Sequence, residues 1–318
     1  MIKQIEMRKK VDEIEVKSVE IALNAKCNLN CKYCGAYSEK DVYLKPRLTV
    51  NEIINELDAL PSLERVKLSG GEVTIDLEDC IKLGEYCKKR QLFYQINTNG
   101  TLISHEDIDN LKKAGLSALH ISLNFLDRES YSQYYNVKEA LFDKIVSNIS
   151  YASQHLECVV ETLLFDETID NLVKLSQFIS NLGASGYEVQ YGISQSGWEN
   201  GIEQEEVEQA VYNLCRKKPK GLILYFSCFE FPAECIAIEK FKNFLNQDDI
   251  YFTNCIEGKQ EFHLSDNGDI IGCELADVKK VGNIHNGFIL GDINKISSVE
   301  KEKLFDLCNN CRKKFRFR

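Results

Sequence analysis

Six short stretches of the chain alternate apolar and polar residues with a period of two. In the first stretch, the apolar residues Val19, Ile21 and Leu23 are separated by single polar or small residues, which is the pattern of a strand with one buried face. The pattern predicts six strands, at residues 18–24, 65–69, 92–98, 117–124, 156–164 and 187–193. Each strand is expected to present one apolar face and one polar face.

Amphipathic helices are predicted between the strands. Thr49 with Glu52, and Ser104 with Asp107, have the spacing of helix capping boxes. A strand–helix repeat of this kind predicts parallel strands whose apolar face is covered by helices. A closed eight-stranded barrel has an apolar interior, whereas these strands would line theirs with polar residues. We therefore expect an α/β fold, an open (βα)6 partial TIM barrel with a large polar ligand in its lumen. The alternative is a sheet with one solvated face, which is commoner in antiparallel proteins.

The pattern changes after residue 197. Residues 202–217 and 233–245 have helical spacing, with a predicted strand at 221–227 between them. Farther along, turn residues at 266–269 separate two short alternating runs and predict a β-hairpin. The expected organisation is an N-terminal lead at residues 1–17, the partial barrel at 18–197, a bridging region at 198–250 and a small C-terminal β-hairpin and helix domain at 251–318.

The charge and the cysteine content of the chain indicate which compartment and which partners to expect. The net charge of the 318 residues is -10, which argues against binding to a phosphate backbone. The first twenty residues lack the apolar run of a signal peptide, and no later run is long enough to span a bilayer. Thirteen cysteines without a secretion signal indicate a reducing compartment. We expect a cytoplasmic protein that has neither nucleic acid nor a membrane as a partner.

Three cysteines follow directly after the first predicted strand. Cys27, Cys31 and Cys34 lie in the sequence CNLNCKYC, and converging thiolates in an intracellular chain indicate zinc or an iron–sulfur cluster rather than a disulfide. Zinc would require a fourth protein ligand, yet no histidine lies within seventy residues downstream. A 4Fe-4S cluster held by three thiolates leaves one iron open to a substrate or cofactor.

The CxxxCxxC spacing, with Tyr33 just before its last cysteine, resembles the radical S-adenosylmethionine (SAM) superfamily. In that family SAM chelates the open iron, and the reduced cluster cleaves the SAM sulfonium to give a 5'-deoxyadenosyl radical. The resemblance implies that Cys27, Cys31 and Cys34 hold a 4Fe-4S cluster and that SAM is a cofactor. It also implies an external one-electron reductant such as flavodoxin or ferredoxin.

Polar motifs end the second, third and fourth predicted strands, at the edge where barrel ligand sites belong. SGGE at residues 69–72 resembles the family motif that holds the amino group of SAM, and TNG follows at residues 98–100. Taken alone, both are ordinary strand-to-loop turns. The resemblance implies cofactor contacts at Ser69, Gly70, Gly71, Glu72, Asn97, Asn99, Ser122 and Asn124.

Four more cysteines lie near the end of the chain. Cys255 and Cys273 have the spacing C-x12-G-x4-C, and Cys308 and Cys311 form a CxxC. This arrangement resembles the twitch domain, the short form of the SPASM domain, which carries one auxiliary 4Fe-4S cluster. Two 4Fe-4S clusters are then implied for the chain. A structural zinc is the alternative, because four thiolates suit its tetrahedral geometry equally well.

Three further side chains are candidates for the chemistry. Some radical SAM epimerases return a hydrogen atom to the substrate from a cysteine thiol, and by that resemblance Cys228 is a candidate donor. Glu188 or Glu161 could act as a general base that takes a hydroxyl proton from the substrate. Ordinary packing explains the cysteine equally well, and both carboxylates could be structural.

The resemblance implies a radical SAM oxidoreductase or maturase that abstracts hydrogen from an unactivated C–H bond. A ribosomally made peptide is the first substrate class, modified by oxidation, cross-linking or epimerisation, although a lead of only residues 1–17 leaves no room for a recognition domain. A dehydrogenase or epimerase of a sugar or aminocyclitol is the alternative. A non-catalytic zinc-binding scaffold is the third hypothesis, and the SGGE and TNG motifs count against it.

Overall fold

The computed structural model describes residues 14–34, 47–191, 201–230, 237–245, 247–252, 256, 258–273, 280–305 and 315–316. Cys255, Cys308 and Cys311 lie outside these residues, so the predicted auxiliary site has only Cys273 within the described chain.

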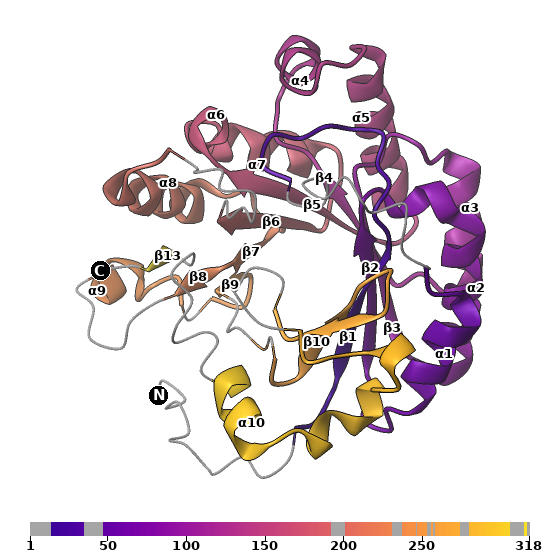
Figure 1. The fold of residues 1–318 in the computed structure, drawn as a ribbon. Helices are drawn as coiled ribbons and strands as arrows, with labels where there is room; N and C mark the ends of the chain where they lie inside the picture. Colours follow the sequence, from indigo (N-terminus) through magenta and orange to yellow (C-terminus); the bar gives the residue numbers. More distant parts are fainter. Residues whose placement is uncertain are drawn as a thin grey trace.

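A curved sheet of mostly parallel strands forms the centre of the molecule (Figure 1). Six strands follow one another in chain order and in the sheet: β1 (Ser18–Asn24), β2 (Arg65–Gly70), β3 (Phe93–Thr98), β4 (Ala118–Ser122), β5 (Glu157–Leu164) and β6 (Gly186–Tyr191). All of their pairings are parallel. The predicted α/β fold is therefore confirmed, and the strand bounds differ from the prediction by only one or two residues at an end.

The sheet extends beyond these six strands at both edges. Next to β6 lie β7 (Ile223–Ser227) and β9 (Ile250–Phe252), and next to β1 lie β10 (Glu261–Leu264), β11 (Asp269–Ile271) and β12 (Gly282–Asn283). The order runs from β12 to β9 without closing, which confirms an open partial barrel. A separate two-stranded pairing joins β8 (Phe229–Glu230) to β13 (Phe315–Arg316).

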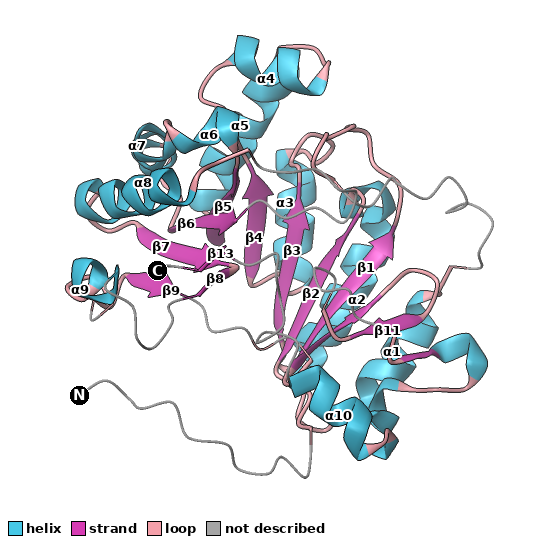
Figure 2. Cartoon of the chain, turned by 60° about the vertical axis from the view of Figure 1, so that its left-hand side comes forward, coloured by secondary structure: helices cyan, strands magenta, loops and turns pink. Residues whose placement is uncertain are grey.

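Helices cover the outer face of the sheet (Figure 2). The helices of the described chain are α1 (Val50–Asp58), α2 (Leu77–Arg90), α3 (His105–Ala114), α4 (Arg128–Tyr135), α5 (Ala140–Ser153), α6 (Asp166–Ile169), α7 (Leu172–Asn181), α8 (Gln204–Lys217), α9 (Ala237–Phe241) and α10 (Ser298–Phe305), with 3-10 turns η2 (Val73–Asp76), η3 (Ile284–Asn286) and η4 (Leu290–Lys295). Both predicted capping boxes form, because Thr49 caps α1 with Glu52 and Ser104 caps α3 with Asp107. None of the described helices is long and apolar enough to cross a membrane.

The hydrophobic core lies between the sheet and this helical layer. Val19, Ile21 and Leu23 on β1 are fully buried there, together with apolar residues of the helices such as Leu57 and Leu111. Removing this much apolar surface from water supplies most of the stability of such a layer. The intervening polar residues face the lumen, which leaves the inner face of the barrel available for polar chemistry.

The predicted C-terminal hairpin forms, and it belongs to the same sheet as the barrel. β10 pairs with β11 in antiparallel fashion and with β1 in parallel. Ser18 is opposite Glu261 in this register, and the Ser18 hydroxyl donates a hydrogen bond to the Glu261 carboxylate. The division into a barrel and a separate C-terminal domain stays a prediction. The sheet itself is continuous from the barrel strand β1 to the C-terminal strand β10.

Candidate functional site

The three cysteines of the CxxxCxxC motif lie in a loop directly after β1. The Leu29 amide donates to the Cys27 Sγ at 3.4 Å, and the Cys34 amide donates to the Cys31 carbonyl at 3.1 Å. Asn99 follows β3, and its side-chain amide nitrogen, Nδ2, donates to the Cys27 Sγ at 3.6 Å. The first two contacts shape the loop, and the third holds it against the carboxyl end of β3, at the edge where a barrel fold places its ligands.

The number of thiols in this loop bears on the two metal hypotheses. A structural zinc site takes four protein ligands, whereas the loop supplies three thiols. A 4Fe-4S cluster can be held by three thiolates, with one iron left open to a cofactor. The donor set of the loop therefore fits such a cluster.

Burial also shapes the chemistry of this loop. Desolvation raises the pKa of the Cys31 thiol to about 12, and it raises the pKa of Cys27 as well. A buried thiol with a raised pKa becomes a thiolate readily only when a cation such as iron is bound to it. The loop is thus suited to thiolate ligands of a metal centre and poorly suited to a free nucleophile.

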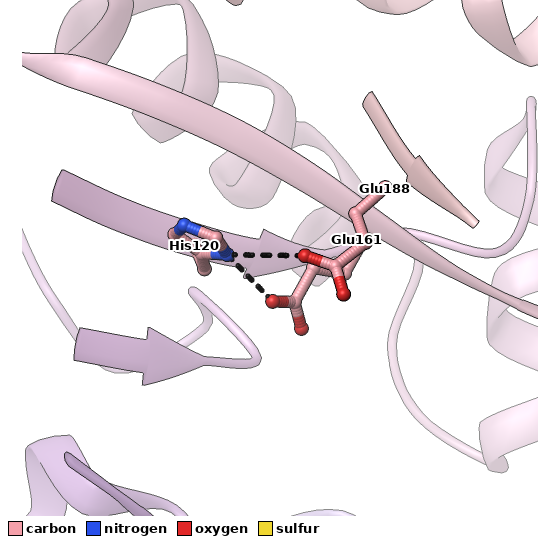
Figure 3. A group of neighbouring side chains, drawn as sticks. All are labelled: His120, Glu161 and Glu188. Atoms are coloured by element: carbon pink, nitrogen blue, oxygen red, sulfur yellow. Dashed lines mark hydrogen bonds and ion pairs between the residues drawn. The ribbon is translucent and has the colours of Figure 1, made fainter. Parts of the chain in front are cut away.

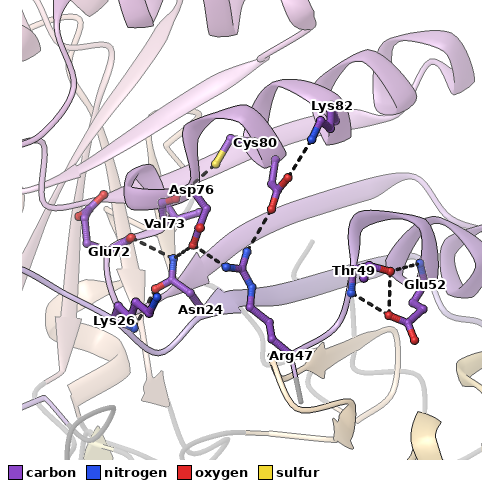
Figure 4. A network of polar contacts seen from close by, with 11 residues as sticks. Asn24, Lys26, Arg47, Thr49, Glu52, Glu72, Val73, Asp76, Cys80 and Lys82 are labelled. Atoms are coloured by element: carbon purple, nitrogen blue, oxygen red, sulfur yellow. Dashed lines mark hydrogen bonds and ion pairs between the residues drawn. The ribbon is translucent and has the colours of Figure 1, made fainter. Parts of the chain in front are cut away.

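The two glycines of SGGE allow the end of β2 to approach the residues that precede the cysteine loop. Two of those residues, Asn24 and Lys26, are drawn in Figure 4 with Glu72 of the same motif. A Cβ atom on Gly70 would lie 2.2 Å from the Asn24 carbonyl oxygen, and one on Gly71 would lie 2.1 Å from the Lys26 carbonyl oxygen. Gly70 also has a φ of 123°, which side chains rarely adopt. Any side chain at Gly70 or Gly71 would therefore clash with the backbone of residues 24–26. The packing of the chain requires glycine at both positions, whether or not SAM binds here.

Four hydrogen bonds from the chain hold the Glu72 side chain of the predicted cofactor set. Its carboxylate is 1% exposed and accepts hydrogen bonds from the Thr74 amide at 3.0 Å, the Thr74 hydroxyl at 2.5 Å, the Thr98 hydroxyl at 2.6 Å and the Asn99 amide at 2.7 Å. It thereby ties the end of β2 to the end of β3. A contact from this carboxylate to SAM stays a prediction.

Asn124 is likewise engaged by the chain. Its amide nitrogen donates to the hydroxyls of Tyr33 and Tyr135, both at 2.8 Å, and its oxygen accepts from the Leu163 amide at 2.9 Å. Tyr33 and Tyr135 also share a hydrogen bond of 2.9 Å. Asn124 therefore fixes Tyr33, the residue before Cys34, and its predicted contact with SAM is untested.

The remaining predicted cofactor residues lie at the ends of strands with partly exposed side chains. Ser69 and Ser122 are half-buried, and so is Asn97, whose side-chain oxygen accepts from the Gln95 amide at 2.8 Å. Their positions at the carboxyl ends of β2, β4 and β3 place them on the same rim of the barrel as the cysteine loop.

His120, Glu161 and Glu188 form a buried polar group on the inner face of β4, β5 and β6 (Figure 3). The His120 Nδ1 lies 2.7 Å from a Glu161 oxygen and 3.7 Å from a Glu188 oxygen. Glu161 and Glu188 are register partners, and the Ser227 hydroxyl donates to Glu188 at 2.5 Å. The structure thus brings together the two carboxylates that the sequence suggested as bases.

His120 is the member of this group that sequence reasoning missed. The signal was present, because His120 occupies a polar position of the fourth predicted strand, two residues before Ser122. Burial alone would lower the pKa of His120, but the hydrogen bond and charge of Glu161, with the charge of Glu188, raise it overall. Burial and the charge of Glu188 raise the pKa of Glu161. Both shifts favour the protonated forms of His120 and Glu161.

Cys228 lies immediately after β7, next to Ser227. It is half-buried and has a φ of 64°, a left-handed conformation that costs a non-glycine residue roughly 1 kcal/mol or more. Its neighbour bonds to Glu188, so the thiol belongs to the same region of the fold as the buried polar group. Its role as a hydrogen-atom donor stays a prediction.

The chain was compared with models of known protein families, and one of them matches. The model of the radical SAM superfamily matches residues 21–179, which include the cysteine loop and the ends of β2 to β5. The chain belongs to the radical SAM superfamily. This membership confirms the resemblance drawn from CxxxCxxC and makes SAM and an iron–sulfur cluster the cofactors that the family implies.

Several curated relatives of this radical SAM protein match about half of its chain. An uncharacterised protein of Methanocaldococcus jannaschii is 34% identical over 163 residues, which are 51% of this chain and 52% of the relative. The chain spans about half the length of the curated relatives that it matches.

Solved structures resemble the chain over nearly all of its length. SuiB of Streptococcus suis in complex with S-adenosylmethionine has a TM-score of 0.67, covering 91% of this chain and 68% of SuiB. The complex of anSMEcpe with AdoMet and the Cp18Cys peptide has a TM-score of 0.65, covering 93% of this chain and 89% of anSMEcpe. Both are 16% identical to this chain, so they show that the fold is shared.

Proposed function

We propose that this radical SAM enzyme holds a 4Fe-4S cluster through Cys27, Cys31 and Cys34 and oxidatively modifies a peptide. The observation that carries the cluster assignment is the geometry of the cysteine loop. Its three thiols lie on the rim of the barrel beside the end of β3, and three thiolates would leave one iron of a 4Fe-4S cluster open to SAM. The family match over the same residues supports the same conclusion.

The strand ends around this loop would hold SAM in two ways. Ser69, Gly70, Gly71, Asn97 and Ser122 lie on the rim and are proposed to contact the cofactor. Side chains whose polar atoms already bond to the chain have a different proposed role, which is to position their neighbours. These are Glu72, Asn99 and Asn124, which fix the end of β3, the Cys27 sulfur and Tyr33 respectively.

When bound, the reduced cluster and SAM supply a 5'-deoxyadenosyl radical that can take a hydrogen atom from an unactivated C–H bond. The residues of this chain orient the reacting groups and exclude water from the lumen. Oxidation of the resulting substrate radical then releases one electron and one proton. The electron would pass to the predicted auxiliary cluster at Cys255, Cys273, Cys308 and Cys311.

The group formed by His120, Glu161 and Glu188 is proposed to accept the proton. The hydrogen bond and charge of Glu161, with the charge of Glu188, raise the pKa of His120. The 2.7 Å contact between His120 and Glu161 would let a proton pass between the two side chains. The Glu188 oxygen that faces His120 at 3.7 Å is the atom proposed to receive the proton.

A peptide is the proposed substrate class. Two structures that share the fold over most of this chain contain peptides, since SuiB is also known in complex with its precursor peptide SuiA and anSMEcpe with the Cp18Cys peptide. The polar lumen is equally suited to a sugar or aminocyclitol, which remains the second candidate. We further propose a cytoplasmic setting and a flavodoxin or ferredoxin as the reductant.

Deuterium transfer can test the substrate class without knowing the substrate. The reconstituted enzyme would be incubated anaerobically with SAM and dithionite and with one of two pools, a digest of fully deuterated protein or a mixture of deuterated sugars and aminocyclitols. Mass spectrometry would measure deuterium in 5'-deoxyadenosine. We expect deuterium from the peptide pool. Deuterium from the sugar pool alone would replace the peptide assignment with the second candidate.

A further inference from the structure

Tyr131 on α4 has a buried hydroxyl that lacks a hydrogen-bond partner. The residue is 2% exposed, and no described residue donates to or accepts from its Oη atom. Leaving a buried hydroxyl unpaired costs roughly 1–3 kcal/mol. Such a group points to a partner that is absent from the protein chain itself.

The surroundings of Tyr131 show in which direction that partner lies. Its ring packs against Tyr135 with centroids 4.7 Å apart, and Tyr135 bonds to Tyr33 of the cysteine loop. Besides burial, the charges of Cys31 and Cys27 raise the pKa of the Tyr131 hydroxyl. Tyr131 is thus linked through one ring, that of Tyr135, to Tyr33, the residue before Cys34.

The acceptors already present on this side of α4 are used by other groups. Glu72, whose charge also acts on the Tyr131 hydroxyl, accepts four hydrogen bonds from Thr74, Thr98 and Asn99. Cys27 accepts from Leu29 and Asn99. An acceptor that the chain does not supply is therefore expected beside the Tyr131 hydroxyl.

We propose that Tyr131 donates a hydrogen bond to a sulfur of the cluster held by Cys27, Cys31 and Cys34, and that this bond raises the reduction potential of the cluster. The inference rests on the proposed function. A reduced cluster carries one more negative charge than an oxidised one, so a donor to its sulfurs stabilises the reduced form more. Tyr131 would thus be a positioning and tuning residue that favours acceptance of the first electron.

The test is a redox titration of the reconstituted Tyr131→Phe protein in the absence of SAM, followed by electron paramagnetic resonance. We expect a shift of the midpoint potential to a more negative value with the iron content unchanged. Tyr151→Phe is the control, because Tyr151 bonds to Asp109 on the outer helical layer. This control should leave the midpoint at the wild-type value.

Thermal unfolding gives a second readout. In protein without iron, Tyr131→Phe removes only an unpaired hydroxyl, so the melting temperature should be equal to or higher than that of the wild type. In the reconstituted protein the same substitution should lower it, whereas a merely structural tyrosine would give the same difference in both forms.

Three outcomes would overturn the inference. An unchanged midpoint at full iron content would remove Tyr131 as a donor while leaving the proposed function intact. A shift that appears only when SAM is added would identify SAM, and not the cluster, as the acceptor. A wild-type chain that takes up no iron would overturn the proposed function and this inference together.

Discussion

At the scale of single residues, Glu72 shows how a motif can serve the chain as well as a cofactor. The resemblance of SGGE to a SAM-binding motif predicted a contact with the cofactor. The structure instead surrounds the carboxylate with donors from Thr74, Thr98 and Asn99. The sequence could not predict this arrangement, because two of these donors belong to the next strand and depend on how β2 and β3 pair.

Replacing Glu72 by Gln separates the two roles. An amide places its NH2 group against donors, so we expect the free energy of unfolding to fall by about 2–3 kcal/mol, measured by urea denaturation without SAM. Glu52→Gln is the control, since Glu52 makes comparable bonds to Thr49 on an exposed helix end, and it should cost no more than about 0.5 kcal/mol. Wild-type stability combined with lost SAM binding would instead support the direct contact.

At the scale of elements, the alternation of apolar and polar residues was sufficient to predict the strands. The predicted strand at 65–69 is observed as Arg65–Gly70, because the period of two directly reflects burial on one face. The register between strands was not predictable, since it depends on pairing over long separations. The sequence therefore indicates Glu161 and Glu188 as two separate candidate bases. Only the pairing of β4, β5 and β6 places His120 beside them.

The buried polar group on β4, β5 and β6 predicts a pH dependence of stability. The pKa of His120 is raised in the folded chain, so its stabilising contribution is fully present below the unfolded pKa of about 6.5 and is lost as pH rises through the folded pKa. The loss in unfolding free energy caused by His120→Gln should therefore be largest near pH 6 and shrink as pH rises.

Denaturant unfolding of both proteins from about pH 6 to about pH 8.5 would measure this difference across the range in which histidine titrates. In a Glu161→Gln background most of the pH dependence should disappear, because the closest charged partner of His120 is gone. With Glu161 unchanged, the difference in unfolding free energy between wild type and His120→Gln should vary with pH. A difference that stays constant would contradict the contact between His120 and a charged Glu161.

At the scale of the whole molecule, the open barrel was predicted and its extent was not. The sequence predicted six parallel strands, whereas β10 continues the sheet beside β1 and β7 continues it beside β6. Ser18 and Glu261 face each other although most of the chain separates them, and no local pattern carries such information. The lumen is consequently bounded by C-terminal strands as well as by the six of the repeat.

The most direct test of the account is anaerobic reconstitution, followed by quantification of iron and an assay for 5'-deoxyadenosine from SAM and dithionite. We predict about four irons per chain for the cluster at Cys27, Cys31 and Cys34, and about eight if the auxiliary cluster also forms. Deoxyadenosine should form, and replacing these three cysteines by Ala should abolish it and remove about four irons. Cys158→Ala, a buried cysteine on β5, should change neither. Zinc without deoxyadenosine would contradict the account.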